Sequence, residues 1–481
     1  MKRVVFFQFI ALCISVFAEA QSGVSLYKKY CAGCHGRKLE GASGPGLKTK
    51  SLIHGNSSTA LYKSIKNGFP GTEMAGFGKS LSNTQITALV NFIRSSPKSP
   101  AVPGSGKGLP GVIATKNYRL KIEKLVTKDL NSPWAIEFID KQKALISERK
   151  TGNLRWLIKG KLDPKPITGL PPVFIQSGTS GMMDIALDPA YKDNGWVYVA
   201  FSHSIGPLAD KDSPAMTKVI RGRVKGYEWI DQQTLFEVAD SQNVKAGDRW
   251  GCRFLFDKSG FLYFSIGDMG KALESQDSTK PVGKVYRINP DGSIPADNPY
   301  IDSPGALPAI YTMGNRNVQG MAIHPVTGDI WASEHGPKGG DELNILRKGA
   351  NYGWPVVTFG IDYDGTKISD STHSNGMMDP VTQWTPSIAV CPVEFCSSPL
   401  FKKWQNNLFV GALAFEELRR LTIADDKVIA QEKLFKGYGR IRDIKFGPDG
   451  ALYVVFNNPD RLVRITPLPP VAKRPAKKIQ K

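Results

Sequence analysis

Long apolar runs are missing from this chain of 481 residues. The apolar stretch from Val4 to Phe17 is too short to span a bilayer, and nothing later approaches the roughly 18 apolar residues that a transmembrane helix needs. The sequence therefore predicts no membrane span.

Acidic residues are scarce relative to basic ones, with 43 Asp and Glu against 63 Lys and Arg and a formal charge of +20. Such an excess can indicate nucleic-acid binding. The folded part nevertheless has no long Lys/Arg run and no nucleic-acid-binding motif, and several positive charges lie in the basic tail after Val471. We expect no nucleic-acid partner, and a basic surface that steers acidic redox partners or substrates.

The first 20 residues have the pattern of an export signal. Lys2 and Arg3 precede the apolar stretch, which ends at Ala18-Glu19-Ala20. No cysteine directly follows Ala20, so a lipoprotein anchor is not expected. Residues 1–20 are predicted to be a signal peptide, and the mature protein to be periplasmic or secreted.

A Cys-x-x-Cys-His motif follows at Cys31-Ala32-Gly33-Cys34-His35. This is the attachment signature of haem c: the thiols of Cys31 and Cys34 form thioethers, and His35 binds the iron. A zinc site would need a second Cys/His pair at metal-ligand spacing, and none is near.

Met74 is the candidate sixth iron ligand, since methionine with histidine is typical of electron-carrying haems. The alternative is that Met74 only packs in the core. Ser82 is expected to cap an amphipathic helix that closes the haem pocket with Ile86, Leu89, Val90 and Ile93. Residues 22–96 are thus predicted to form a small all-α monohaem cytochrome c domain.

A Pro/Gly/Ser-rich linker is predicted over residues 97–114, and a basic disordered tail over 467–481. Between them, residues 115–466 repeat a unit of an alternating strand, a Pro/Asp/Gly turn and a second strand. Six copies predict an all-β six-bladed propeller, and a β-sandwich is the weaker alternative. The equivalent apolar positions are Phe138, Leu187, Phe256, Ile323, Phe395 and Phe446.

The segment from Tyr311 to Pro355 concentrates polar chemistry between glycines. Gly314-Asn315-Arg316-Asn317 combines a cation with amides, which suits a planar anion rich in carbonyl groups. The stretch from Glu334 to Glu342 has three acidic residues in a Gly/Pro turn, which indicates a calcium site. The alternative is an acidic surface turn.

Arg440 and Arg442 lie two apart at the start of the last repeat, so both side chains point to one side of a strand. Two guanidinium groups on one face could hold a tricarboxylate such as pyrroloquinoline quinone (PQQ). A surface salt-bridge face is the alternative.

The motifs G-x-R-N-x-Q-G from Gly314, E-H-G-P-x-G-G-D-E-x-N from Glu334 and A-N-Y-G-W-P from Ala350 stand here in order. In this the chain resembles the soluble PQQ-dependent aldose (glucose/sorbosone) dehydrogenases, over roughly residues 115–466. The resemblance implies that PQQ contacts Arg316, Asn317, Tyr363, Arg440 and Arg442. It also implies one Ca²⁺ at Glu342 and the Tyr352 carbonyl, and another, touching the quinone, at the Gly336 and Pro337 carbonyls.

The sequence departs from this family at the catalytic position. The family's base is a histidine in an H-x-x-x-R strand, and Arg249 stands there with Arg253 following. A guanidinium group stays protonated and cannot accept a proton. Asp248 and Glu394 are the candidate replacements. A glutamine that the family has in the second repeat is also absent, and Thr179-Ser180-Gly181-Met182-Met183-Asp184 stands there.

Three cysteines remain for the propeller: Cys252, Cys391 and Cys396. An odd number in an oxidising compartment suggests one disulfide and one free thiol. Cys391 with Cys396 is the simplest pair, although connectivity does not follow from sequence.

The sequence therefore predicts an exported oxidoreductase. A sugar or other alcohol would reduce PQQ, and electrons would pass through haem c to a redox protein or a quinone-linked acceptor. The alternative is a non-catalytic ligand-binding propeller that carries an electron-transfer domain. The loss of the family histidine at Arg249 is the feature that separates them.

Overall fold

The computed structural model describes residues 22–35, 39, 46–48, 52, 55–68, 74, 76–96, 108–176, 178–245, 247–363 and 365–469. The predicted signal peptide, most of the predicted linker and residues 470–481 of the tail lie outside this set. Among the described residues, no helix has the length and apolar character needed to cross a membrane.

Short helices form the N-terminal domain: α1 (Gly23–Tyr30), α2 (Ala32–His35), α3 (Ser58–Asn67) and α4 (Asn83–Ser95). The predicted cap of α4 is confirmed. Ser82 Oγ accepts from the Gln85 amide, and the Gln85 side chain accepts from the Ser82 amide, which is a complete capping box. The predicted apolar face of α4 is buried against α1 and α3.

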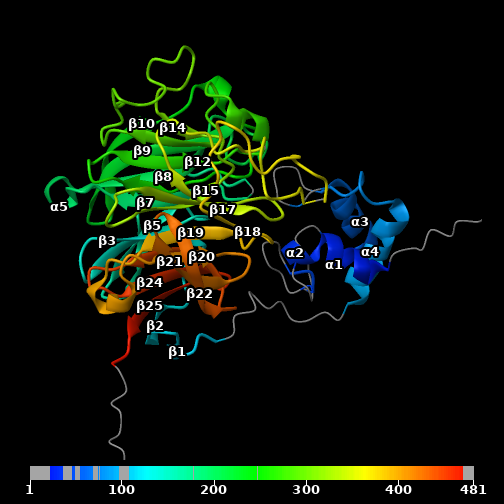
Figure 1. Cartoon of the computed structure of the whole chain (residues 1–481), viewed down its shortest axis with the longest axis horizontal. Helices are drawn as coiled ribbons and strands as arrows, with labels where there is room; N and C mark the ends of the chain where they lie inside the picture. Colours follow the sequence, from blue (N-terminus) through cyan, green and yellow to red (C-terminus); the bar gives the residue numbers. More distant parts are fainter. Residues whose placement is uncertain are drawn as a thin grey trace, which may run out of the picture.

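The rest of the chain is a six-bladed propeller, as predicted (Figure 1). Five blades are four-stranded antiparallel sheets. Within each of them, every strand pairs with the next strand along the chain. These strands are β3 (Pro133–Phe138), β4 (Lys143–Glu148), β5 (Asn153–Ile158), β6 (Lys161–Ile167), β7 (Met182–Leu187), β8 (Trp196–Ser204), β9 (Ala215–Lys225), β10 (Glu228–Phe236), β11 (Phe254–Phe256), β12 (Leu262–Ile266), β13 (Lys284–Ile288), β14 (Ile310–Met313), β15 (Val318–Ile323), β16 (Ile330–Glu334), β17 (Asp341–Leu346), β18 (Thr382–Trp384), β19 (Val390–Phe395), β20 (Leu408–Ala412), β21 (Glu417–Ala424) and β22 (Lys427–Lys436).

The sixth blade closes the ring with strands from both ends of the propeller sequence. β23 (Arg440–Phe446), β24 (Leu452–Asn457) and β25 (Arg461–Pro467) are completed by β2 (Arg119–Val126) and β1 (Val112–Ala114). Because β2 pairs with β25 antiparallel, backbone hydrogen bonds fasten the first blade segment to the last. The predicted linker was too long at its C-terminal end, since Val112–Ala114 pairs with β2 as a strand.

The repeated apolar positions of the sequence mark one structural position. Each is the last residue of the innermost strand of a blade, from Phe138 in β3 to Phe446 in β23. Neighbouring innermost strands contact one another around the ring, and β23 contacts β3. Because every repeat begins with this strand, the six strands all start at one end of the propeller and finish at the other.

The expected disulfide between Cys391 and Cys396 is wrong. Both cysteines are buried and neither forms a disulfide. Cys391 lies near the start of β19 and Cys396 directly follows its end. Five residues of extended strand separate their Cα atoms by about 16 Å, and a disulfide needs less than about 7 Å.

The helical domain lies beside the loops that precede and follow β17, where Figure 1 shows its blue helices against the yellow segments of the propeller. It contacts the same end of the propeller at which the innermost strands begin. The Lys338 side chain contacts the helical domain there, and Gly365 lies beside Tyr30.

Candidate active site

Residues predicted to bind a cofactor cluster where the innermost strands begin. Arg440 is the first residue of β23, and Asn317 directly precedes β15. Arg316 and Arg442 are buried, with 4% and 6% of their surface exposed. Since the innermost strands start at one end, residues far apart in sequence converge there.

Several arginine side chains share this space, and burial with their mutual repulsion lowers the pKa of two of them. Burial, and then the charges of Arg253, Arg440 and Arg149, hold the pKa of Arg442 down to about 10. Burial also lowers the pKa of Arg149 to about 10; the charge of Asp460 opposes this shift, and the charge of Arg440 adds to it. An arginine normally titrates above 12, so the site destabilises its own charges and favours an anionic ligand.

The same positive charges affect His335. Its side chain is buried, and its pKa lies well below the ordinary value because of burial and the charges of Arg316, Arg442 and Arg440. His335 Nε2 and Arg316 Nε have no hydrogen-bond partner within the described part of the chain. Buried polar atoms are normally paired, so each of these two atoms could pair with a polar ligand.

The remaining hydrogen bonds fix the arginines in place. Arg316 Nη1 donates to the carbonyls of His335 (3.0 Å) and Gly336 (2.8 Å). Arg442 Nη1 donates to Gln319 Oε1 at 3.0 Å, and its guanidinium carbon lies 4.3 Å from the centre of the Trp134 ring. The guanidinium groups are thus held before any ligand arrives, which lowers the entropy lost on binding.

Arg249 occupies the family's base position and is held between two buried carboxylates. Its Nε donates to Asp268 Oδ1 at 2.6 Å, and its Nη1 lies 3.6 Å from Asp248 Oδ2. Burial acts to lower the pKa of Arg249, but the charges of Asp268 and Asp248 outweigh it and raise the pKa above its usual range. Arg249 therefore remains a cation, and Asp248 is the nearer of the two proposed replacements for the missing base.

Tyr363 and Trp354 border the same group. Tyr363 lies close enough to Arg249 to contribute to its raised pKa. Trp354 Nε1 donates to Asp268 Oδ2 at 2.8 Å, so Asp268 joins Trp354 to Arg249. Thr179 lies against the backbone of Asp248 and accepts from the Trp250 amide at 3.1 Å.

Glu394 lies away from this group, near the far end of β19. Burial raises its pKa to about 7, and Lys445 and Glu137 are among its charged neighbours. Lys445 is also paired with Glu137. Glu394 thus belongs to a buried charge network at the opposite end of the innermost strands.

The acidic loop places two carboxylates side by side. Glu334 and Glu342 face each other on β16 and β17. Burial raises the pKa of Glu334 to about 7, and burial together with the charge of Glu334 raises that of Glu342 to about 8. Tyr352 is close enough to Glu334 for that charge to add to the effect of burial on its own pKa. A cation among these groups would relieve the repulsion.

The backbone carbonyls expected at a second calcium are engaged within the loop. Gly336 O accepts from Arg316, and Pro337 O accepts from the Gly339 amide at 3.0 Å. In the part of the chain that the structure covers, no three His, Cys, Asp or Glu side chains are arranged to hold a metal ion. A calcium site here would thus depend on the Glu334–Glu342 pair and on carbonyl oxygens.

In the helical domain, Cys31 and His35 are buried, with 6% and 8% of their surface exposed. Met74 is half-buried and packs against the same apolar core as Cys31. The Cys34 side chain lies outside the described part. Haem ligation by these residues stays a prediction.

Asp268 and Arg149 belong to the site but were missed in the sequence, and Gln319 was noted only as part of the G-x-R-N-x-Q-G motif, without a role. Asp268 lies in the Gly267–Gly270 turn after β12, and this glycine-flanked aspartate was a usable signal. Arg149 directly follows β4 and Gln319 lies inside β15. Only the convergence of separate blades gives these two side chains their role.

Comparison with known proteins agrees with this arrangement. The Glucose / Sorbosone dehydrogenase family model matches residues 130–464, and the model for Cytochrome C oxidase, cbb3-type, subunit III matches residues 18–93. Aldose sugar dehydrogenase YliI of Escherichia coli is 35% identical over 354 residues, covering 72% of this chain and 93% of the relative.

Two solved structures resemble the propeller. The apo form of the soluble aldose sugar dehydrogenase from Escherichia coli has a TM-score of 0.66 at 33% identity, over 73% of this chain and all of that one. The PQQ-bound aldose sugar dehydrogenase from Streptomyces coelicolor has a TM-score of 0.57 at 25% identity, over 72% of this chain and 98% of that one. The chain belongs to the glucose/sorbosone dehydrogenase family of oxidoreductases, with a cytochrome c domain joined to its N-terminus.

Proposed function

We propose that this protein is an exported quinohaemoprotein dehydrogenase, which oxidises a sugar or another alcohol with PQQ and passes the electrons to its own haem c. The observation that carries the proposal is the group of arginines at the start of the innermost strands, where Arg316 and Arg442 are buried and burial with neighbouring positive charge lowers the pKa of Arg442. Relatives named as quinoprotein or PQQ-bound dehydrogenases support the same cofactor.

The residues present fit PQQ. Arg440 and Arg442 would hold its carboxylates, and the unpartnered Nε of Arg316 and Nε2 of His335 offer polar atoms for the rest of its edge. Asn317 and Tyr363 complete the proposed contacts. When bound, PQQ supplies an oxidant that accepts two electrons from an alcohol carbon.

Calcium would be held by Glu342 and the Tyr352 carbonyl at one position, and by the Gly336 and Pro337 carbonyls at another. Its charge would offset the repulsion between Glu334 and Glu342, which adds to burial in raising the pKa of Glu342. A calcium ion next to the cofactor would also stabilise negative charge on its oxygens.

We assign the proton-accepting role to Asp248. Its ion pair with Arg249 favours the ionised carboxylate, which is the form that can accept a proton from a substrate hydroxyl. Arg249 would orient the substrate oxygen with its guanidinium donors, while Asp268 and Trp354 hold Arg249 in position. Burial of the group excludes water and strengthens each of these interactions.

A non-catalytic ligand-binding propeller is the second candidate, favoured only by Arg249 in the place of the family's histidine. Titration of the protein with PQQ and calcium, followed by dye reduction with a panel of aldoses and polyols, separates the two. Tight cofactor binding with substrate-dependent dye reduction supports the dehydrogenase. Binding without turnover of any member of the panel supports the second candidate, and failure to bind PQQ contradicts the first.

A further inference from the structure

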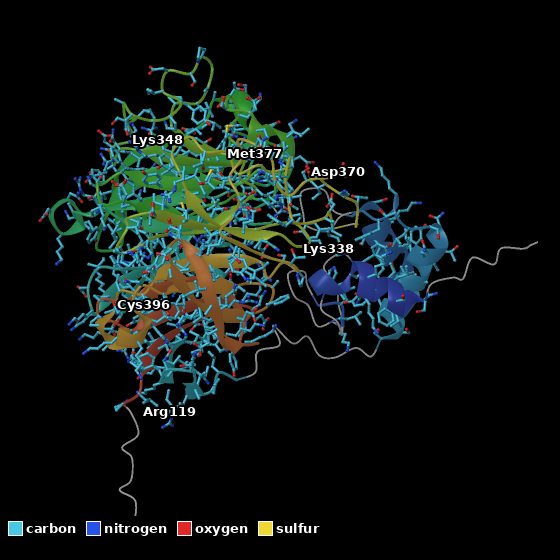
Figure 2. The ribbon with its side chains drawn as sticks, viewed as in Figure 1. Arg119, Lys338, Lys348, Asp370, Met377 and Cys396 are labelled. Carbon is cyan, nitrogen blue, oxygen red and sulfur yellow. The ribbon has the colours of Figure 1, made fainter. Side chains whose placement is uncertain are left out.

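Lys338 joins the loop between β16 and β17 to the haem domain. Its Nζ donates to the carbonyl oxygen of Lys29 at 3.1 Å. Lys29 is in the last turn of α1, where backbone carbonyls have no partner within the helix and carry partial negative charge. Figure 2 shows Lys338 at the boundary between the propeller and the helices. The ammonium group therefore caps a helix of the other domain.

A second loop reaches the haem domain beside the first. The backbone amide of Lys338 donates to the Ile361 carbonyl at 3.0 Å, so the two loops are bonded to each other. In the second loop, a Cβ atom built on Gly365 would lie 3.8 Å from Cε1 of Tyr30. The Tyr30 ring therefore lies beside Gly365 of this loop.

Each of these loops also contributes to the proposed cofactor site. The first holds the Gly336 carbonyl that Arg316 contacts, two residues before Lys338. The second holds Tyr363, two residues before Gly365 and close to Arg249. Two residues of chain span at most about 7.6 Å between Cα atoms. The docking contacts thus lie within one short loop segment of the cofactor contacts.

In the haem domain, the contact residues also lie next to a proposed cofactor position in the sequence. Lys29 and Tyr30 immediately precede Cys31, which the sequence predicts to be bonded to the haem. The Tyr30 ring also lies 5.9 Å from the Phe77 ring inside the helical domain. The propeller therefore touches the haem domain at the segment that carries the haem attachment.

We propose that residues 336–339, 361–363 and 365 of these two loops form the docking surface for the haem domain, and that Lys338 is the positioning residue that holds the haem attachment segment over the cofactor site. This inference rests on the proposed function. Each electron that leaves the reduced quinone reduces one haem iron from ferric to ferrous. A downstream redox protein or quinone-linked acceptor reoxidises the iron before the second electron follows, and the two protons pass to solvent.

The test compares Lys338→Met, which keeps the length and apolar stem of the side chain but removes the donor, with Lys338→Arg, which keeps a donor. Lys367→Met is the matched control, because Lys367 lies on the second loop and pairs with Asp370 on the surface. All three are made in the full chain, loaded with haem, PQQ and calcium. Stopped-flow spectra after mixing with sugar follow quinone reduction and haem reduction separately.

We expect Lys338→Met to slow haem reduction at least tenfold, equivalent to about 1.4 kcal/mol, while quinone reduction keeps its wild-type rate. Lys338→Arg should stay within threefold of wild type, and Lys367→Met should match it. Unchanged haem reduction in Lys338→Met would overturn the proposal. An equal loss in Lys367→Met would also overturn it, because the effect would then be one of general surface charge.

Hydrogen exchange on the full chain without PQQ keeps docking separate from catalysis. Lys338→Met should speed amide exchange in residues 360–367 and in the last turn of α1, and Lys367→Met should not change α1. If this holds but no variant shows quinone reduction, the docking surface stands and the proposed function fails. Unchanged exchange in Lys338→Met would contradict the docking surface itself.

Discussion

Arg253 and Arg442 are both buried in the centre of the propeller, but their neighbours differ. Arg253 donates to Asp184 at 3.1 Å and lies 3.4 Å from Asp443. Although burial opposes it, these two carboxylates raise the pKa of Arg253 above its usual range. Arg442 has no such pair among the described residues, and its pKa falls.

This difference distinguishes a structural charge from a ligand-binding one. A buried charge is costly unless an opposite charge and hydrogen bonds compensate for it. Within the fold, Arg253 has that compensation and connects three blades. Arg442 lacks it, and the missing negative charge is what an anionic cofactor would bring. Arg249 is intermediate, because it is fully paired but lies at the edge of the cofactor site.

We expect the largest effect on activity from a change at Asp248, the carboxylate paired with Arg249. Asp248→Asn should lower kcat/KM for sugar oxidation by about 10²–10⁴-fold, the usual contribution of a positioned base. Its melting temperature should change little, because Arg249 keeps Asp268 at 2.6 Å.

Glu394→Gln is the matched control for this variant, since it removes one carboxylate from Lys445 and leaves Glu137. The control should keep the wild-type rate. A wild-type rate in Asp248→Asn would show that Asp248 is not the proton acceptor, and a rate lost only in Glu394→Gln would move that role to Glu394.

Removing the structural arginine should cost stability. Arg253→Met leaves two buried carboxylates without their partner, so the free energy of unfolding of the cofactor-free protein should fall by about 3–5 kcal/mol. Arg442→Met should change it by less than about 1 kcal/mol, because the lost hydrogen bond to Gln319 is offset by relief of repulsion. Denaturant titration of both variants measures this. Equal losses would remove the distinction between the two arginines.

Removing the ligand arginines should weaken PQQ binding. Arg442→Ala and Arg440→Ala should each raise the Kd of PQQ by roughly 10–150-fold, since a hydrogen bond to a charged group contributes about 1.5–3 kcal/mol. Fluorescence titration with calcium present measures the affinity. Lys433→Ala, which removes an exposed lysine 3.7 Å from Glu417, is the control. An unchanged affinity in both arginine variants would place the cofactor elsewhere.

Calcium should supply the positive charge that offsets the repulsion between Glu334 and Glu342. Chelation should lower the melting temperature of the propeller, since a ligand at 100 times its Kd stabilises the folded state by about 2.7 kcal/mol. Glu342→Gln should abolish the response to chelator, and it should also be more stable than wild type when calcium is absent, because it no longer repels Glu334. A wild-type protein that is insensitive to confirmed metal removal would contradict this site.

Features that repeat along the chain were predictable from the sequence. The apolar positions from Phe138 to Phe446 recur in each repeat because every blade has the same alternation, and all six mark the ends of the innermost strands. The cap at Ser82 was equally local. The arginine pair at Arg440 and Arg442 followed from the period of a strand.

Features that depend on long-range convergence were not predictable. The closing strand β2 pairs with β25 across more than three hundred residues, and short strand β1 follows from that pairing. Asp268 gains its role only when Arg249 and Trp354 meet it from other segments. The expected disulfide between Cys391 and Cys396 was wrong, because an extended strand carries residues that are close in sequence far apart in space.

The most direct test of the account is the redox state of the haem after sugar is added to the full chain, loaded with PQQ and calcium and kept without oxygen or dye. The account predicts that glucose or another sugar of the panel turns the ferric haem ferrous, and that the same protein without PQQ stays ferric. A haem that stays ferric with every sugar and alcohol tried, while PQQ is bound and the quinone is reduced, would contradict it.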